Sequence, residues 1–380
     1  MRRLELPTPD AAALRASHAL AECIAQELRA CGNWMSFARY MQLALYEPQL
    51  GYYAAGAAQL GPAGDFVTAP ELSPLFGCTL ARQLAALLRP GDAILEFGAG
   101  SGALAAQLCD ELVRLGAGAP TYLILETSRA LRERQRERLG VRAQWIERLP
   151  ERFCGVMLAN EVADAMPVHA MAWTRRGIAE RGVCLNEGQL AWCEHPAAGE
   201  LAARAGEIEI ELPPSGRYES ELSLAAPAWL HSLGAALERG AIFVIDYGFP
   251  QREYYHPQRS MGTLMCHYRH RAHGDPFLHP GLQDITAHVD FSALARAAEA
   301  SDLELLGYAG LAQFLVNCGI TEVLGAEDAL DVAHYAPLAA SAQVLLSPAE
   351  MGELFKVLAL GRGVTVPLAG FTQGDRSHAL

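Results

Sequence analysis

The sequence has little lysine and no long apolar segment. Lys356 is the only lysine among 380 residues, so arginine carries nearly all of the positive charge. The formal net charge is -13 at pH 7, which argues against non-specific binding to nucleic acid, because such binding requires a basic surface. No apolar run approaches the roughly twenty residues of a membrane-spanning helix, so no membrane span is expected.

The N-terminal residues lack the features of a targeting segment. Two arginines are followed by no apolar stretch, which argues against a secretory signal peptide. Glu5 and Asp10 do not suit a transit peptide. We therefore expect a cytoplasmic protein.

The nine cysteines are scattered and contain no Cys-x-x-Cys pair. This is typical of reduced cysteines in a protein interior, and not of a disulfide framework or a zinc ribbon. Cys266, His267, His270 and His273 could converge on a metal if their segment were helical. The glycine and prolines that follow do not suit a helix, so we expect no metal site. The histidines would instead form local hydrogen bonds or line a pocket.

From residue 89 onward, short apolar runs alternate with helical patterns. Four runs are expected to be strands: 93–98, 121–127, 143–148 and 154–161. Helical patterns at 101–115 and 128–139 separate the first three. This alternation predicts a parallel sheet with both faces covered.

Other patterns surround this core. Helices are expected before it, at 11–31, 36–45 and 78–88. An antiparallel meander is expected at 168–194, and a helix at about 222–239 leads into a buried strand at 241–248. The remaining expectations are helices at 291–300, 311–318 and 348–361 and strands at 303–309 and 364–371.

The stretch "ILEFGAGSGAL" (94–104) places glycines where the first strand meets a helix. Gly98, Gly100 and Gly102 let the backbone approach a ligand, and the helix N-terminus supplies N–H groups. The pattern also fits a dinucleotide fingerprint, so a nicotinamide or flavin site and a purely structural turn are alternatives.

Three features favour S-adenosylmethionine as the cofactor. Glu96 precedes the glycines, and its carboxylate would repel a pyrophosphate but attract the ammonium of a methionine. The sheet begins only after about ninety residues of helix and loop. Glu126 ends the next strand, where an acid can accept hydrogen bonds from both ribose hydroxyls.

Polar residues also follow the fourth strand, in "ANEVADAMPVH" (159–169). Because ligands bind at the carboxyl ends of such strands, we expect Asn160, Glu161 and Asp164 to face the cofactor's reactive end and the substrate. The alternative is that Asn160 and Asp164 only cap the next turn.

The segment 251–290 has neither helical nor strand periodicity. Loops of this length are uncommon in a compact domain and are usually disordered or functional. Its tyrosines and phenylalanines argue against disorder, so we interpret it as an ordered lid over a ligand site.

Several long motifs resemble the MidA-type methyltransferases, whose mitochondrial member is a complex I assembly factor that methylates protein arginine. The motifs are "GDFVTAPELSPLFG", "ILEFGAGSG", "NEVADAMPVH", "DYGFPQREYYHPQR", "GTLMCHYRHRAHGDPFLHPGLQDITAHVDF", "QFLVNCGI" and "MGELFKVLALGRG". The resemblance runs from about residue 34 to the C-terminus. It implies that Gly64, Asp65, Phe66 and Thr68 cover the cofactor. Ala69 and Ala99 depart from the usual family residues without removing a charge.

The resemblance implies an α/β fold of the class I methyltransferase type. This fold is a Rossmann-like, mostly parallel twisted sheet with an antiparallel last strand, an N-terminal helical region and inserted substrate-side elements. We divide the chain into N-terminal helices and a cofactor-covering loop (1–77), the first half of the core (78–167), an inserted meander with helices (168–235), a core strand (236–250), a substrate-side lid (251–290) and the second half of the core with a helical insertion (291–380).

The expected activity is methylation of arginine in a protein, with a subunit of NADH:quinone oxidoreductase as a candidate substrate. Glu161 and Asp164 would orient the guanidinium and take a proton, with Asp246 and Tyr247 in reserve. Substrate contacts, or purely structural roles, are expected for Tyr247, His267, His270, Asp284 and His288. The alternatives are methylation of a small molecule or another protein residue, a cofactor-binding assembly chaperone with little turnover, and a nicotinamide oxidoreductase.

Overall fold

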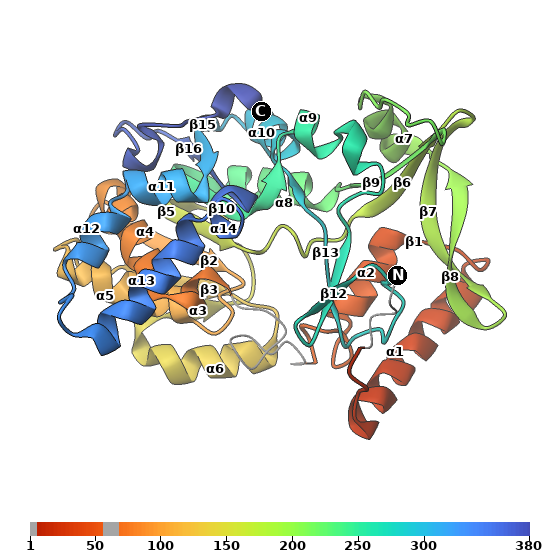
Figure 1. Cartoon of the computed structure of the whole chain (residues 1–380), viewed down its shortest axis with the longest axis horizontal. Helices are drawn as coiled ribbons and strands as arrows, with labels where there is room; N and C mark the ends of the chain where they lie inside the picture. Colours follow the sequence, from red (N-terminus) through yellow and green to blue (C-terminus); the bar gives the residue numbers. More distant parts are fainter. Residues whose placement is uncertain (1–5, 56–67) are drawn as a thin grey trace. The chain divides into compact units, whose positions relative to one another are not determined.

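The computed structural model describes residues 6–55 and 68–380 (Figure 1). Its contacts group the chain into two compact units, each built from three separate stretches. The first unit comprises Met1–Phe66, Asp164–Ala226 and Gln251–His288, and the second comprises Val67–Ala163, Pro227–Pro250 and Val289–Leu380. The six-part division made from the sequence stays a prediction.

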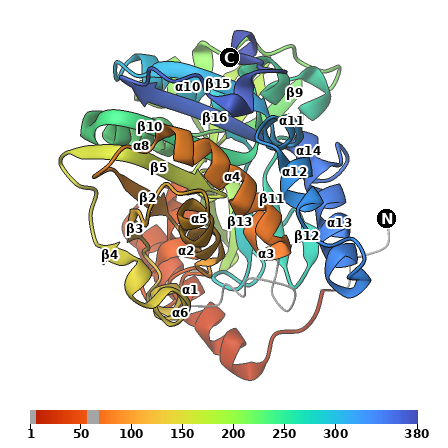
Figure 2. The ribbon, with the colours of Figure 1, turned by 90° about the vertical axis from the view of Figure 1, so that its left-hand side faces the viewer.

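The second unit is organised by an eight-stranded sheet. Its order is β15-β16-β10-β5-β2-β3-β4, with β14 beside β10, and Figure 2 shows this order from β15 near the top to β4 at the lower left. The strands are β2 (Ala93–Phe97), β3 (Thr121–Leu125), β4 (Gln144–Ile146), β5 (Phe153–Asn160), β10 (Leu237–Phe249), β14 (Val289–Asp290), β15 (Glu304–Gly310) and β16 (Phe355–Arg362). All pairings are parallel except those of β16, which runs antiparallel to β10 and β15. The expected mostly parallel sheet with an antiparallel last strand is confirmed.

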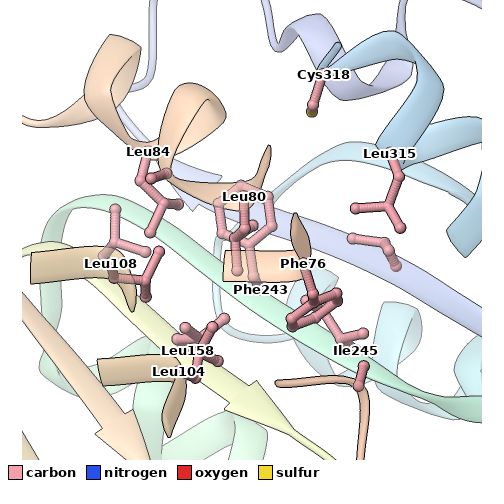
Figure 3. Close-up of a cluster of buried hydrophobic side chains, with 14 of the residues drawn as sticks. Phe76, Leu80, Leu84, Leu104, Leu108, Leu158, Phe243, Ile245, Leu315 and Cys318 are labelled. Carbon is pink, nitrogen blue, oxygen red and sulfur yellow. The ribbon is translucent and has the colours of Figure 1, made fainter. Parts of the chain in front are cut away.

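Helices surround this sheet. They are α3 (Ala69–Leu72), α4 (Pro74–Leu87), α5 (Ala103–Arg114), α6 (Arg129–Leu139), α8 (Ala225–Ala236), α10 (Phe291–Glu299), α11 (Leu311–Asn317), α12 (Ile320–Gly325), α13 (Val332–Leu346) and α14 (Met351–Leu354). Some of them, such as α12 and α13, pack on other helices. Leu80 of α4 and Leu108 of α5 lie in one buried cluster with Leu158 and Phe243 of the sheet (Figure 3). Burying each such side chain contributes about 1.5–3 kcal/mol, so this cluster holds the strand ends in place.

The first unit contains two antiparallel sheets. One has the order β1-β7-β6-β9 with β8 paired to β7, and the other has the order β12-β11-β13. Its strands are β1 (Met35–Ser36), β6 (His169–Thr174), β7 (Gly177–Asn186), β8 (Gln189–Pro196), β9 (Arg217–Leu222), β11 (Met265–Tyr268), β12 (Arg271–His273) and β13 (Asp284–Thr286). Its helices are α1 (Ala11–Ala30), α2 (Phe37–Tyr46), α7 (Gly199–Gly206) and α9 (Gln251–Tyr254). The meander expected at 168–194 is therefore part of a larger antiparallel sheet.

The C-terminal segment corrects one expectation. The helix expected at 348–361 is a short helix, α14, followed by β16, and 364–371 contains a 3-10 turn (Ala369–Phe371) instead of a strand. Seven of the eight residues of β16 are buried. A strand buried on both faces has no alternation, so a short apolar run cannot be told from a buried helix by its pattern.

The segment 251–290 also differs from the aperiodic loop that we expected. It contains α9 and the three strands of the β12-β11-β13 sheet. β11 pairs with β12 and also with β13, which lies further along the chain, and strands of three or four residues are too short to show a period. Within the described residues, no helix is long and apolar enough to cross a membrane.

Candidate active site

The glycine turn lies between β2 and α5 of the second unit. Gly98, Gly100 and Gly102 have φ angles of 59°, 55° and 80°, which side chains disfavour and glycine adopts freely. Gly102 is the N-cap of α5 and makes no side-chain capping hydrogen bond. The turn is therefore a backbone cradle beside the N–H groups of the first turn of a helix, as the sequence predicts.

Glu96 lies on β2 directly before this turn and is 2% exposed. Its Oε2 accepts a hydrogen bond of 2.7 Å from the hydroxyl of Tyr122 on β3. Burial raises the pKa of Glu96 to about 7, the Tyr122 hydrogen bond opposes this shift, and the negative charge of Glu126 adds to it. A cation placed beside Glu96 would favour its ionised form.

Glu126 follows β3 directly and is also buried. Its Oε1 accepts from the Ser128 N–H at 2.9 Å, and its Oε2 accepts from Nε2 of Gln135 at 3.0 Å. Burial raises the pKa of Glu126, whereas these donors oppose the rise. The carboxylate is thus held in one orientation at the carboxyl end of β3.

Sequence reasoning missed Gln135 and Tyr122. Gln135 lies on the buried face of α6, in line with Leu131 and Leu139, while the rest of that helix is mostly charged. A polar residue on the apolar stripe of a helix is a signal that could have found it. Tyr122 carries no such signal, because a tyrosine is ordinary in a buried strand.

A second missed network surrounds the glycine turn. The hydroxyl of Ser101 donates to the carboxylate of Glu71 on α3 and accepts from Nη1 of Arg138 on α6 at 2.6 Å. Thr68 is the N-cap of α3. The other residues expected to cover the cofactor, Gly64, Asp65 and Phe66, lie outside the described residues.

The carboxyl end of β5 carries Asn160 and Glu161. Nδ2 of Asn160 donates to Oε1 of Glu161 at 3.2 Å. The buried Oδ1 of Asn160 meets no donor among the described residues, and a buried acceptor without a donor usually awaits a ligand or water. Glu161 has a φ of 55°. Such backbone strain in a non-glycine residue is typical of functional sites.

Asp246 on β10 is fully buried and contacts the turn after β5. Its Oδ2 accepts from the N–H groups of Val162 and Ala163 at 3.2 and 3.0 Å. Its Oδ1 accepts from the N–H of Tyr247 at 2.9 Å. The carboxylate therefore holds the backbone that presents Glu161. The ring of Tyr247 packs edge-on against Phe355.

The remaining expected residues belong to the first unit. The backbone carbonyl of Asp164 accepts from the Ala287 N–H at 3.0 Å. His267 on β11 lies opposite Asp284 on β13, and Asp284 accepts a 2.9 Å hydrogen bond from the hydroxyl of Tyr53.

The other two expected histidines lie outside the strands: His270 in the turn between β11 and β12, and His288 between β13 and β14. The N–H of His288 donates to the hydroxyl of Thr263 at 3.0 Å. His270 has a φ of 60° in the turn between β11 and β12. The structure thus pairs His267 with Asp284 and leaves His270 at a tight turn.

The cysteine and histidines considered as metal ligands do not share one face of the sheet. Cys266 is opposite His273 across β11 and β12, and His267 follows Cys266 in the strand and so points to the other face. Among the residues that the structure describes, no three histidine, cysteine or acidic side chains are grouped to hold a metal ion.

Residues 75–309 match a family model described as an S-adenosyl-L-methionine-dependent methyltransferase. The chain belongs to this family. It is 30% identical to the protein arginine methyltransferase NDUFAF7 of Mus musculus, over 86% of this chain and 80% of that protein. It is 28% identical to the protein of the same name from Danio rerio, over 89% of each.

A solved structure extends this comparison to the cofactor. A protein from Burkholderia thailandensis, described as a likely methyl transferase, was crystallised bound to S-adenosyl-homocysteine. It is 49% identical to this methyltransferase, and the two structures match with a TM-score of 0.94 over 99% of this chain and 100% of that chain. The protein is a methyltransferase of the class I fold with S-adenosylmethionine as its cofactor. The expected cytoplasmic location is wrong by these comparisons, because the curated relatives are named as mitochondrial proteins.

Proposed function

We propose that this methyltransferase transfers the methyl group to arginine in a protein substrate. Support comes from Glu161, whose carboxylate stands on a strained backbone at the carboxyl end of β5. Relatives named as protein arginine methyltransferases support the same substrate class. The family resemblance makes a subunit of NADH:quinone oxidoreductase the first substrate to test.

The residues of the second unit fit the cofactor. The glycine cradle leaves backbone space, Glu96 suits an ammonium, Glu126 suits ribose hydroxyls, and Asn160 offers a buried acceptor. When bound, S-adenosylmethionine supplies a methyl group on a sulfonium sulfur. Contacts of Gly64, Asp65 and Phe66 with the cofactor are proposed from the family resemblance alone.

Orientation of the guanidinium and removal of its proton are proposed roles of the protein's own side chains. A guanidinium is cationic and a poor nucleophile, so carboxylates must orient it and accept the proton that its nitrogen gives up. Glu161 and Asp164, three positions apart in the sequence, are proposed for these two tasks. Alignment of the nucleophile and exclusion of water supply the rest of the acceleration.

Segment 251–290 is proposed to contact the substrate. His267 and Asp284 lie opposite each other on adjacent strands, and they offer a hydrogen-bonding pair to a polar side chain. Tyr247, His270 and His288 are further proposed contacts. For each of these residues, a purely structural role remains the alternative hypothesis.

The test is transfer of a radiolabelled methyl group into a cell lysate, followed by mass spectrometry of the labelled product. We expect label in arginine of one or a few proteins, and none with Glu161→Gln. Label in a small molecule or in another amino acid would overturn the proposed substrate. If the wild-type protein binds cofactor but labels nothing in any lysate, the assembly-chaperone alternative replaces this proposal.

A further inference from the structure

Gln135 is a buried, uncharged residue of α6, a helix whose other residues are mostly charged. Its side chain is 0% exposed, and it shares the inner face of α6 with Leu131 and Leu139. Transfer of an amide from water to an apolar interior is unfavourable unless the amide is hydrogen-bonded. A leucine would suit the helix stripe better, so the amide calls for a reason beyond packing.

The hydrogen bonds of Gln135 supply that reason, because they join three segments of the second unit. Nε2 donates to the carbonyl oxygen of Gly100 at 2.9 Å and to Oε2 of Glu126 at 3.0 Å. Oε1 accepts from Nε1 of Trp145 on β4 at 2.8 Å. Both amide hydrogens are therefore used, and the Trp145 bond determines which way round the amide lies.

The hydrogen bonds of Gln135 fix the position of the Glu126 carboxylate relative to Gly100, and both residues are candidate cofactor contacts. Gly100 is the centre of the glycine turn, and Glu126 is the acid at the end of the next strand. A carboxylate has about four acceptor positions. Gln135 and the N–H of Ser128 occupy one on each oxygen of Glu126, so the carboxylate cannot rotate while both bonds persist.

We propose that Gln135 is a positioning residue for recognition of the cofactor ribose. It sets the Glu126 carboxylate against the glycine turn, so that the oxygens of Glu126 meet the ribose hydroxyls without first reorienting. This inference rests on the proposed contact between Glu126 and the ribose. The hydrogen bond that Gln135 donates also opposes the effect of burial on the pKa of Glu126, and so favours the ionised carboxylate.

A merely structural role for Gln135 would have a different consequence. Loosening of the fold weakens every ligand of the site to a similar degree. Misplacement of Glu126 weakens only those ligands that carry the ribose hydroxyls. Comparison of S-adenosyl-homocysteine with its 2′,3′-dideoxy analogue, which carries neither hydroxyl, therefore separates the two roles.

The experiment measures both affinities by calorimetry in wild type and in Gln135→Met. We expect wild type to prefer S-adenosyl-homocysteine over the analogue. In Gln135→Met, affinity for S-adenosyl-homocysteine should fall about tenfold or more, as expected for loss of one hydrogen bond to a charged group. The analogue should lose much less, so that the ratio of the two affinities approaches one. An equal loss for both ligands would overturn the proposal.

Two further variants keep the result interpretable. Gln83 is another buried glutamine of the same unit and accepts a 2.9 Å hydrogen bond from the Gly370 N–H. Gln83→Met should leave the ratio of affinities unchanged. Trp145→Phe keeps Gln135 but removes the donor to its Oε1. The ratio of the affinity for S-adenosyl-homocysteine to that for the analogue should therefore fall, but by less than in Gln135→Met. An unchanged ratio in Trp145→Phe counts against the proposal, even if Gln135→Met does not fold.

Glu126→Gln distinguishes failure of this inference from failure of the proposed cofactor contact. If Glu126→Gln leaves the preference for the ribose hydroxyls intact, the proposed contact of Glu126 is wrong. If Glu126→Gln abolishes the preference while Gln135→Met and Trp145→Phe retain it, Glu126 recognises the ribose without help from Gln135, and this inference is wrong.

Discussion

The carboxylate of Asp246 accepts a hydrogen bond from the backbone N–H of Ala163 at 3.0 Å. The same oxygen accepts from Val162, so one atom of β10 secures the turn at the end of β5. That turn carries Glu161 at a φ of 55°, a conformation that costs of the order of 1–3 kcal/mol. Asp246 therefore stabilises the strained presentation of Glu161.

This relationship predicts different outcomes for two substitutions of Asp246. In Asp246→Asn, the amide oxygen can occupy the place of Oδ2 and keep both bonds to the turn, although the NH2 group then replaces the acceptor of the Tyr247 N–H. Asp246→Ala loses all three bonds. We expect Asp246→Asn to retain most of the methyl transfer. Asp246→Ala should lose activity and about 2–4 kcal/mol of the free energy of unfolding, because buried N–H groups lose their partners. Steady-state kinetics and urea unfolding measure both effects.

The two variants also test the earlier expectation that Asp246 acts as a base. An amide cannot accept a proton at neutral pH. If Asp246→Asn is as inactive as Asp246→Ala while remaining folded, Asp246 takes part in proton transfer and the positioning role is wrong.

Glu161 and Asp164 are expected to act on kcat and not on cofactor affinity. Glu161→Gln and Asp164→Asn keep the size of each side chain but remove its charge. At least one of them should lower kcat by about 10²–10⁴, the range for loss of a general base, while the Kd for S-adenosyl-homocysteine stays within a few-fold of wild type. Methylation at the wild-type rate by both variants would mean that the wrong carboxylates have been chosen.

Gly100→Val should abolish binding of S-adenosylmethionine. The φ of 55° at Gly100 is strained for a β-branched residue, and the side chain would enter the backbone cradle. Calorimetry should show heat for wild type with S-adenosylmethionine, none for wild type with NAD, and none for Gly100→Val with either ligand.

A matched control separates strain from loss of the cradle. Gly116 has a φ of 76° just beyond α5, and a Cβ there would meet open space. Gly116→Ala should cost about 1 kcal/mol of stability and leave binding unchanged. If both variants lose binding equally, global destabilisation explains the result.

Cofactor affinity should depend on pH through Glu96. Burial raises the pKa of Glu96 to about 7, so the free protein holds a proton there below that pH, and a ligand ammonium prefers the ionised form. Affinity for S-adenosyl-homocysteine should fall below pH 7 by up to about tenfold per pH unit and level off above it. Glu96→Gln should bind weakly with little change across this range. A wild-type affinity that is constant from mildly acidic to neutral pH would contradict the proposed contact.

The same pKa has a consequence for stability, with a definite sign. The pKa of Glu96 in the folded protein lies above its ordinary value of 4.5, so the folded state binds more protons than the unfolded state between these values. The contribution of Glu96 to stability is present below pH 4.5 and is lost as the pH rises through about 7. Glu96→Gln should flatten this part of the stability profile in urea unfolding.

Backbone amides of the β12-β11-β13 sheet should exchange slowly with solvent. Cys266 and Ile285, paired across β11 and β13, are each buried. We expect hydrogen-exchange mass spectrometry to show protection here, increasing when ligand is added. Rapid proteolysis between Gln251 and Pro280 in the liganded protein, or stoichiometric zinc in the purified sample, would contradict the proposed ordered, metal-free lid.

The placement of the proposed cofactor residues could be predicted from the sequence because its signals are local. Glycines that need positive φ, an acid before them and an acid after the next strand all lie within a strand or its adjoining turn. Neighbouring parallel strands then bring Glu96 and Glu126 to the same sheet edge through register alone, as Phe97 paired with Leu125 shows.

Only the tertiary structure decided which partners these residues have. Tyr122 reaches Glu96, Gln135 reaches Gly100 and Glu126, and Asp246 reaches a turn more than eighty residues earlier. The assignment of β16 as a strand and the pairing of β11 with β13 also depend on distant segments. Hydrogen bonds between remote segments form only when the core has packed, so no local periodicity or motif encodes them, whereas φ preferences and strand–turn–helix order are properties of neighbouring residues.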